Sequence, residues 1–116
     1  MTANLQTEDY QVVSDPDSGT VTLSGSLRLA GAEEYLPISE ILDATALAHP
    51  QSVLIDVRGL QFLNSSGINM LSKFVLKMRD MPGTAISIQG SAEVPWQNRS
   101  LKNLQRLLPS LTLVIR

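Results

Sequence analysis

Apolar and polar residues alternate along several short segments of the chain, which is the pattern of strands with one buried face. In the segment 20–27, Val21, Leu23 and Leu27 share one face, and Gly25 indicates a bulge or a bend. The strands predicted from such segments, or from short aliphatic runs, span residues 10–13, 20–27, 52–57, 84–89 and 111–115.

The start of the chain predicts a hairpin. Residues 15–19 are dense in turn formers, so the strand at 10–13 is expected to pair with the strand at 20–27. Before them, the polar residues 1–9 predict a flexible or weakly ordered N-terminus. The aliphatic run 52–57 differs from these segments, because it predicts a central strand covered on both faces.

Three longer segments place apolar residues three or four positions apart, which is the spacing of amphipathic helices. They span residues 37–47, 68–80 and 95–108, and Pro37 falls in the first turn of its segment, where proline is tolerated. His49-Pro50 closes the first helix. The apolar stripes consist of Ile38, Ile41, Leu42 and Leu47 in the first helix, Ile68, Leu71, Phe74, Val75 and Met78 in the second, and Leu101, Leu104, Leu107 and Leu108 in the third.

The element order is therefore β-β-α-β-α-β-α-β. Strands that alternate with helices favour an α/β fold with a mixed, mostly parallel sheet, right-handed crossovers, an N-terminal edge hairpin and three main helices. The 116 residues are enough for one domain, 1–116, and too few for two.

Composition narrows the function classes. The chain is 43% hydrophobic, has no cysteine and carries a net charge of −2 with interspersed signs. It therefore has no thiolate metal site and no basic stripe that would bind nucleic acid. We expect no cofactor, no bound metal and no nucleic-acid partner. No apolar run approaches the ~20 residues of a membrane span, and no signal peptide is evident, so we expect a cytoplasmic protein without a membrane partner.

Residues 53–68 carry the clearest candidate for chemistry. A strand ends near Val57, a turn follows at Gly59, and a short loop is expected to carry Phe62 and Leu63 inward before two serines and a helix. Ser65 or Ser66 is suited to cap that helix, because a hydroxyl can accept from its unpaired backbone N–H groups.

Two interpretations of this segment remain open from the residues alone. The serines serve only as helix caps, or Ser65 is phosphorylated. A phosphate is accommodated at a helix N-terminus by the aligned peptide dipoles and free N–H groups. A partner packed on the same surface would meet a bulky dianion and be expelled.

Three short motifs in this region resemble the signature of STAS domains, the anti-sigma factor antagonists. They are Leu54-Ile55-Asp56-Val57, Gly59-Leu60 and Phe62-Leu63-Asn64-Ser65-Ser66-Gly67-Ile68. The resemblance implies a non-catalytic regulatory module in a partner-switching pathway. Its partners would be a serine kinase that is also an anti-sigma-like protein, and a serine phosphatase.

Carried over by position, the resemblance makes Ser65 the phosphorylation site. It makes Ser66 its neighbour and Gly67 the small residue that allows close approach of a partner. We expect partner binding at Asn64, Ser66, Gly67, Asn69 and Lys73. Asp56 is expected to support the switch loop by accepting from its backbone N–H groups. Two segments depart from the family pattern: Asn64 stands where the family has Asp, and Gly25-Ser26-Leu27-Arg28 replaces an early Gly-Glu-Leu-Asp.

Other functions stay open as alternatives. Asn64 motivates a constitutive STAS-like scaffold without phosphorylation, and a small hydrolase or a small-ligand sensor is a third class. Against a hydrolase, the chain has one histidine, His49, and its serines lack a Gly-x-Ser-x-Gly elbow. Lys73 and Lys77 lie on an exposed helix face that is either solvated or complementary to an acidic partner. Trp96 is expected to anchor a helix start, and the edge hairpin leaves a surface on which a dimer could form.

Overall fold

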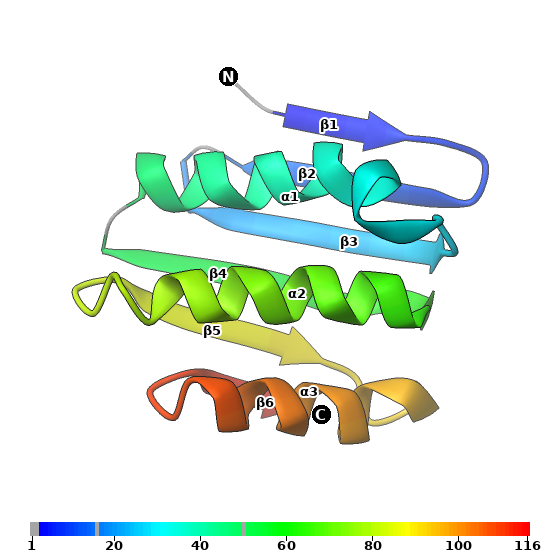
Figure 1. Cartoon of the computed structure of the whole chain (residues 1–116). Coiled ribbons are helices and arrows are strands. Elements are labelled where there is room, and N and C mark those ends of the chain that lie inside the picture. Colours follow the sequence, from blue (N-terminus) through cyan, green and yellow to red (C-terminus); the bar gives the residue numbers. More distant parts are fainter. Residues whose placement is uncertain (1–2, 16, 50) are drawn as a thin grey trace.

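The computed structural model describes residues 3–15, 17–49 and 51–116, and over these residues it forms one six-stranded sheet with three helices (Figure 1). The strands lie side by side in chain order, from β1 to β6. The pairs from β1 to β3 are antiparallel, and those from β3 to β6 are parallel. The elements are β1 (Ala3–Gln6), β2 (Tyr10–Asp15), β3 (Thr20–Leu27), α1 (Gly31–Ala48), β4 (Ser52–Leu63), α2 (Ser65–Met78), β5 (Ala85–Gly90), α3 (Pro95–Leu107) and β6 (Thr112–Ile115).

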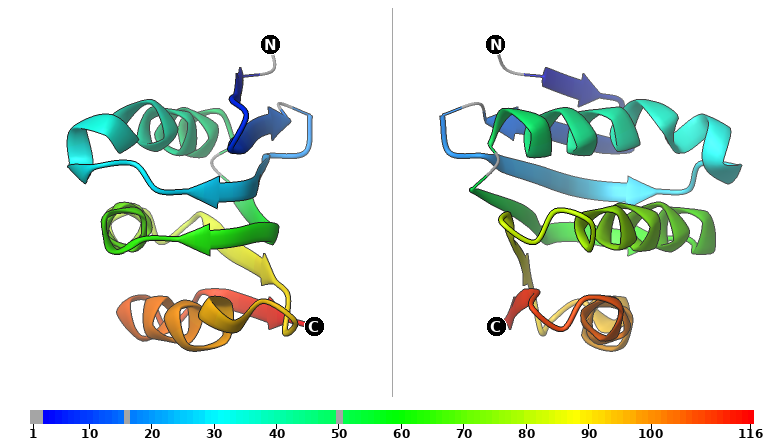
Figure 2. Two further views of the ribbon diagram at one scale, coloured as in Figure 1. Left: turned by 90° about the vertical axis from the view of Figure 1, so that its right-hand side faces the viewer. Right: turned by 60° about the vertical axis from the view of Figure 1, so that its left-hand side comes forward.

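All three helices cover the same face of the sheet (Figure 2). The core lies between the helices and this face, where β4 contributes Val53, Ile55 and Val57. The intervening Leu54 and Asp56 are only partly buried, because they point to the uncovered face. The expectation that this strand is covered on both faces is therefore wrong. A chain that always crosses over on one side leaves the other side of its sheet to solvent.

The predicted hairpin is confirmed, since β2 and β3 pair in antiparallel register from Tyr10↔Gly25 to Asp15↔Thr20, but the strand at the sheet edge is β1 and not β2. The structure adds β1, which pairs with β2 from Ala3↔Ser14 to Gln6↔Gln11. A strand thus occupies part of the segment that was expected to be flexible or weakly ordered. The polar sequence of β1 does not predict a strand, because β1 is held by hydrogen bonds to β2 and not by a buried apolar face.

Helix α1 begins six residues before the predicted start, at Gly31. Pro37 therefore lies inside the helix and not in its first turn, so the backbone lacks one hydrogen bond there. Ile38 and Leu42 are buried as predicted, but Leu47 is 75% exposed and does not belong to the apolar stripe. His49 caps the end of the helix, as predicted for this junction, while Pro50 lies outside the described residues.

Strand β4 continues to Leu63, through the turn and loop that the sequence predicts. Its pairing with β3 shifts register between Thr22 and Ser24 and again between Gly25 and Ser26. Each shift accommodates one extra residue of β4, and Gly59 pairs with Ser24 without ending the strand. Leu63 is buried as expected. Phe62, however, is 39% exposed, so its inward orientation is corrected.

The second half of the chain follows the sequence prediction closely. Helix α2 buries Leu71, Phe74, Val75 and Met78, and α3 begins at Pro95. In the part of the chain that the structure describes, none of the helices is both long and apolar enough to span a bilayer.

Candidate functional site

Asn64, and neither serine, caps helix α2. The Asn64 Oδ1 atom accepts a hydrogen bond from the Gly67 backbone N–H at 3.0 Å and another from the Tyr35 hydroxyl at 2.6 Å. The prediction of a serine cap at residue 65 or 66 is therefore wrong by one or two positions. Asparagine is as good an N-cap as serine, so propensity alone does not select among three consecutive capping residues.

The same side chain also holds the segment between β3 and α1. Asn64 Nδ2 donates to the Leu29 carbonyl at 2.8 Å, and the Asn64 backbone N–H donates to the Leu27 carbonyl at 3.2 Å. A carboxylate would replace the cap but has no proton to give Leu29. The asparagine that departs from the family motif thus has a structural role that aspartate does not reproduce.

Tyr35 and Gly67 pack directly behind this cap. Tyr35 is fully buried, and burial raises the pKa of its phenol above the ordinary value of 10.0, so it remains a hydrogen-bond donor at neutral pH. A Cβ at Gly67 would lie 2.8 Å from the Tyr35 hydroxyl oxygen and would collide with Leu63. A glycine is therefore required at position 67 because Leu63 and Tyr35 of the same chain occupy the space that a side chain would need. Its assignment to the partner surface is corrected, because the residue is buried.

Ser65 is the first residue of α2 and is exposed. Ser66 follows it and is partly buried. Because Asn64 is the cap, the cap hydrogen bond does not involve the Ser65 hydroxyl. The arrangement leaves Ser65 accessible at a helix N-terminus.

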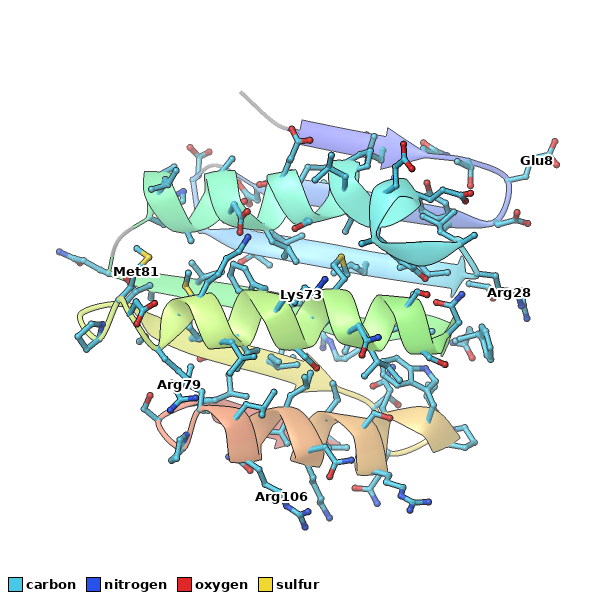
Figure 3. The ribbon with its side chains drawn as sticks, viewed as in Figure 1. Glu8, Arg28, Lys73, Arg79, Met81 and Arg106 are labelled. Carbon is cyan, nitrogen blue, oxygen red and sulfur yellow. The ribbon has the colours of Figure 1, made fainter. Side chains whose placement is uncertain are left out.

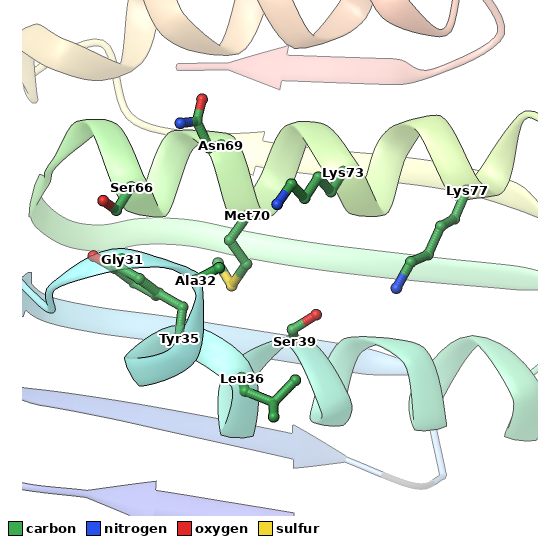
Figure 4. A pocket seen from close by; sticks show the side chains of 10 residues that line it. All are labelled: Gly31, Ala32, Tyr35, Leu36, Ser39, Ser66, Asn69, Met70, Lys73 and Lys77. Atoms are coloured by element: carbon green, nitrogen blue, oxygen red, sulfur yellow. The ribbon is translucent and has the colours of Figure 1, made fainter.

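A groove of about 370 Å³ runs between α1 and α2 beside this helix start (Figure 4). The predicted partner residues Ser66, Asn69 and Lys73 line it together, whereas Asn64 and Gly67 do not line it. The α1 wall and the rest of the α2 wall consist of Gly31, Ala32, Tyr35, Leu36, Ser39, Met70 and Lys77.

The electrostatics of the groove differ along its length. Lys77 donates to Asp43 at 2.9 Å, so its charge is balanced within the chain. Lys73 is exposed and lies toward the middle of α2 (Figure 3). Leu36, on the opposite wall, is 52% exposed. The groove therefore combines an apolar wall with a cationic one.

Asp56 does not support the serine segment. Its carboxylate accepts from the backbone N–H and the guanidinium of Arg58, at 2.9 to 3.1 Å, on the uncovered face of the sheet. The hydrogen bond from the Arg58 side chain is the main reason that the pKa of Asp56 lies below its ordinary value. The prediction is wrong because Asp56 alternates with the buried Ile55 and Val57, and α2 lies on their side of the sheet.

The remaining candidates have structural positions. Trp96 donates from its indole N–H to the Leu60 carbonyl at 2.9 Å and so anchors the start of α3, as predicted. His49 lies at the C-terminal end of α1, whereas Ser65 begins α2 at the other end of β4 (Figure 1). Over residues 3–15, 17–49 and 51–116, acidic and histidine side chains form no group of three that could hold a metal ion.

Sequence reasoning missed two contributions to the site, those of Tyr35 and Arg28. Tyr35 lies in a segment without a predicted element, so no periodicity marked it as buried. Arg28 places its guanidinium carbon 4.5 Å from the centre of the Phe62 ring. The contact could have been inferred from the positions of the two residues, because Arg28 directly follows β3 and Phe62 lies near the end of the adjacent, parallel β4.

Comparison with known proteins gives matches at the level of structure. No protein-family model and no curated protein sequence matches the chain. Apo-SiaC from Pseudomonas aeruginosa superposes with a TM-score of 0.77 at 14% identity, with 100% of this chain and 98% of that chain covered. An anti-sigma factor antagonist from Mycobacterium paratuberculosis superposes with a TM-score of 0.59 at 18% identity, covering 97% of this chain and 84% of that one.

The fold is STAS-like. A third similar chain comes from the crystal structure of the diguanylate cyclase SiaD in complex with its activator SiaC from Pseudomonas aeruginosa. It has a TM-score of 0.74 and 12% identity over 97% of both chains. At these identities the likeness concerns the STAS-like fold: a mixed sheet with three helices, as the sequence pattern predicts, and with β1 as a sixth strand that the pattern does not predict.

Proposed function

We propose that this chain is a non-catalytic regulatory module that binds protein partners and is switched by phosphorylation of Ser65. The observation that carries the proposal is the separation of two roles at the start of α2. Asn64 provides the cap, and the neighbouring Ser65 is exposed. A kinase can therefore reach the hydroxyl, and modification does not break the hydrogen bonds that hold the helix start.

The modification is a phosphoryl transfer. The γ-phosphoryl group of ATP forms a bond to the Ser65 oxygen, ADP leaves, and the hydroxyl proton is released. A phosphatase returns the serine by adding water and releasing inorganic phosphate. The phosphoserine carries about −1.5 to −2 charges, which a helix N-terminus stabilises by roughly 0.3–1 kcal/mol when exposed.

The same charge acts against a docked partner. A partner seated on the groove between α1 and α2 would cover Ser66 and Asn69 and approach Ser65. Covering a bulky, hydrated phosphate with a partner surface that fitted the unmodified serine is unfavourable, so the modified surface releases the partner while the domain stays folded. The surface assigned to partners is therefore the α2 wall, with Ser66, Asn69 and Lys73.

The similar structures support a regulatory role by analogy of fold. One is described as an anti-sigma factor antagonist, and SiaC is described as the activator of a diguanylate cyclase. For this chain we propose a cytoplasmic partner-switching pathway with a serine kinase, itself anti-sigma-like, and a serine phosphatase. No cofactor enters the proposal.

The test compares Ser65→Ala with the matched variant Ser66→Ala. Each purified protein is incubated with extract of its source cells and ATP, and phosphosites are mapped by mass spectrometry. We expect phosphate on Ser65 in the wild type and in Ser66→Ala, and none in Ser65→Ala. Both variants should keep a free energy of unfolding within about 0.5 kcal/mol of the wild type, because neither serine is the cap.

A pull-down with Ser65→Asp completes the test. Loss of a partner that the wild type and Ser65→Ala both retain supports the switch. If all three proteins retain the partner equally and Ser65 carries no phosphate, the result contradicts the switch and supports a constitutive scaffold.

A further inference from the structure

Arg28 and Phe62 form a cation–π pair at the end of the sheet where α2 begins. The guanidinium carbon lies 4.5 Å from the ring centre, and Phe62 is 39% exposed. Figure 3 shows Arg28 at the same end of the molecule as the start of α2. A large apolar side chain and a cation thus share an exposed position there, and neither has a role in the core.

The backbone of Arg28 is held against the residue that precedes Ser65. The carbonyls on either side of Arg28, those of Leu27 and Leu29, both accept hydrogen bonds from Asn64, one from its backbone and one from its side chain. The strands agree with this placement, since Leu27 pairs with Leu63 in parallel register. The backbone of Arg28 is therefore fixed opposite Asn64, which is the residue that directly precedes Ser65 in the chain.

The two lysines of α2 are less well placed than Arg28 to contact a group on Ser65. Lys73 follows Ser65 by eight residues, about 12 Å along the helix axis. Lys77 lies one turn further and is paired with Asp43. Arg28 is the cation whose backbone is tied to the start of α2.

We infer that Arg28 is the intramolecular receptor for the phosphate on Ser65. In the unmodified protein the guanidinium rests on Phe62. After phosphorylation it moves to the phosphate, because a charge-assisted, bidentate guanidinium–phosphate contact is stronger than an exposed cation–π contact. The move uncovers the Phe62 ring, so one modification changes both the charge at the start of α2 and the apolar surface at this end of the sheet. The inference rests on the proposed phosphorylation of Ser65.

The test installs phosphoserine at position 65 during synthesis of the full chain, so it needs no kinase. The wild type, Arg28→Gln and the matched control Arg79→Gln, which changes an exposed arginine at the opposite end of α2, are each prepared with and without the phosphate. Two quantities are measured: the melting temperature at low salt, and the NMR signals of the Phe62 ring and the arginine Nε–H groups.

We expect phosphorylation to move the Phe62 ring signals and one arginine Nε–H signal in the wild type and in Arg79→Gln. In Arg28→Gln it should lower the melting temperature by about 4 °C more than in the wild type, the shift expected for one solvent-exposed ion pair in a domain of this size. The difference should shrink in 0.5 M salt.

Equal shifts of melting temperature in the wild type and Arg28→Gln, or unmoved Phe62 signals, would overturn the inference. Failure of the proposed function is a separate result, because it is seen as missing phosphate on Ser65 after incubation with extract and ATP.

Discussion

Replacing Asn64 by alanine tests the central claim about this site, that one amide side chain holds the start of α2. The change removes three hydrogen bonds at once: those from Gly67 N–H and the Tyr35 hydroxyl to Oδ1, and that from Nδ2 to the Leu29 carbonyl. Nothing in alanine replaces either the acceptor or the donor.

The magnitude follows from the exposure of each orphaned group. Loss of an N-cap destabilises a helix by about 1 kcal/mol. The Tyr35 hydroxyl belongs to a residue with 0% exposure, and an unpaired buried donor costs about 1–3 kcal/mol. Leu29 is partly buried, so water can replace part of its lost bond. We therefore expect a loss of about 3 kcal/mol and a fall in melting temperature of roughly 12 °C.

The assay is urea unfolding followed by circular dichroism, with Asn69→Ala as the control, because Asn69 is an exposed asparagine on the same helix. The control should stay within about 0.5 kcal/mol of the wild type. Asn64→Asp separates the two functions of the amide, because it keeps the acceptor and loses the donor, and should be destabilised by about 1 kcal/mol. An Asn64→Ala protein as stable as the control would refute the reasoning.

Two further predictions address the neighbouring packing and the uncovered face. Gly67→Ala should destabilise the protein by about 1–2 kcal/mol in thermal unfolding, because the collision of its Cβ with Leu63 outweighs the better helix propensity of alanine. In the control Gly83→Ala the new Cβ meets no atom within 4 Å, so this variant should be as stable as the wild type. Equal effects of the two substitutions would contradict the packing at Gly67. Asp56→Asn should lower the free energy of unfolding by less than about 1 kcal/mol at pH 7, because the ion pair with Arg58 is partly exposed. Arg58 lowers the pKa of the Asp56 carboxyl below 3.8, so the ionised form stabilises the folded protein at neutral pH. This contribution is lost as the pH falls through the lowered pKa. Urea unfolding of both proteins from pH 7 to pH 2 checks it, and a difference that persists at pH 2 would show that the ion pair is not its source.

The elements that the sequence predicts well are those in which local pattern and tertiary packing agree. The stripe of α2, from Leu71 to Met78, has the helical period and lies on the core. Strand β5 alternates between buried and more exposed residues, as its sequence alternates between apolar and polar ones. In both cases one periodicity determines the element and its buried face, so the pattern suffices.

Prediction fails where a distant part of the chain decides the structure. Pro37 suggested a helix start, but Tyr35 before it is buried against the end of β4, so burial extends α1 across the proline. Gly59 suggested a turn, but pairing with β3 carries the strand onward to Leu63. The cap could not be assigned among residues 64 to 66, because the choice depends on Tyr35 and Leu29, which are 29 and 35 residues away in the chain.

These long-range contacts also explain how Asn64, which stands where the STAS motif that this segment resembles has an aspartate, still holds the start of α2. Asn64 gives up the charge of an aspartate, and in return its amide proton binds the carbonyl of Leu29, next to Arg28. The backbone of a cationic residue is thereby held beside the residue that precedes Ser65, where the STAS motif that this segment resembles has an anion. If Ser65 carries a phosphate, that exchange changes the local balance of charge from repulsion to attraction. The substitution is then part of how this chain would hold its modified state, and the stability of the helix start does not depend on the serine that is modified.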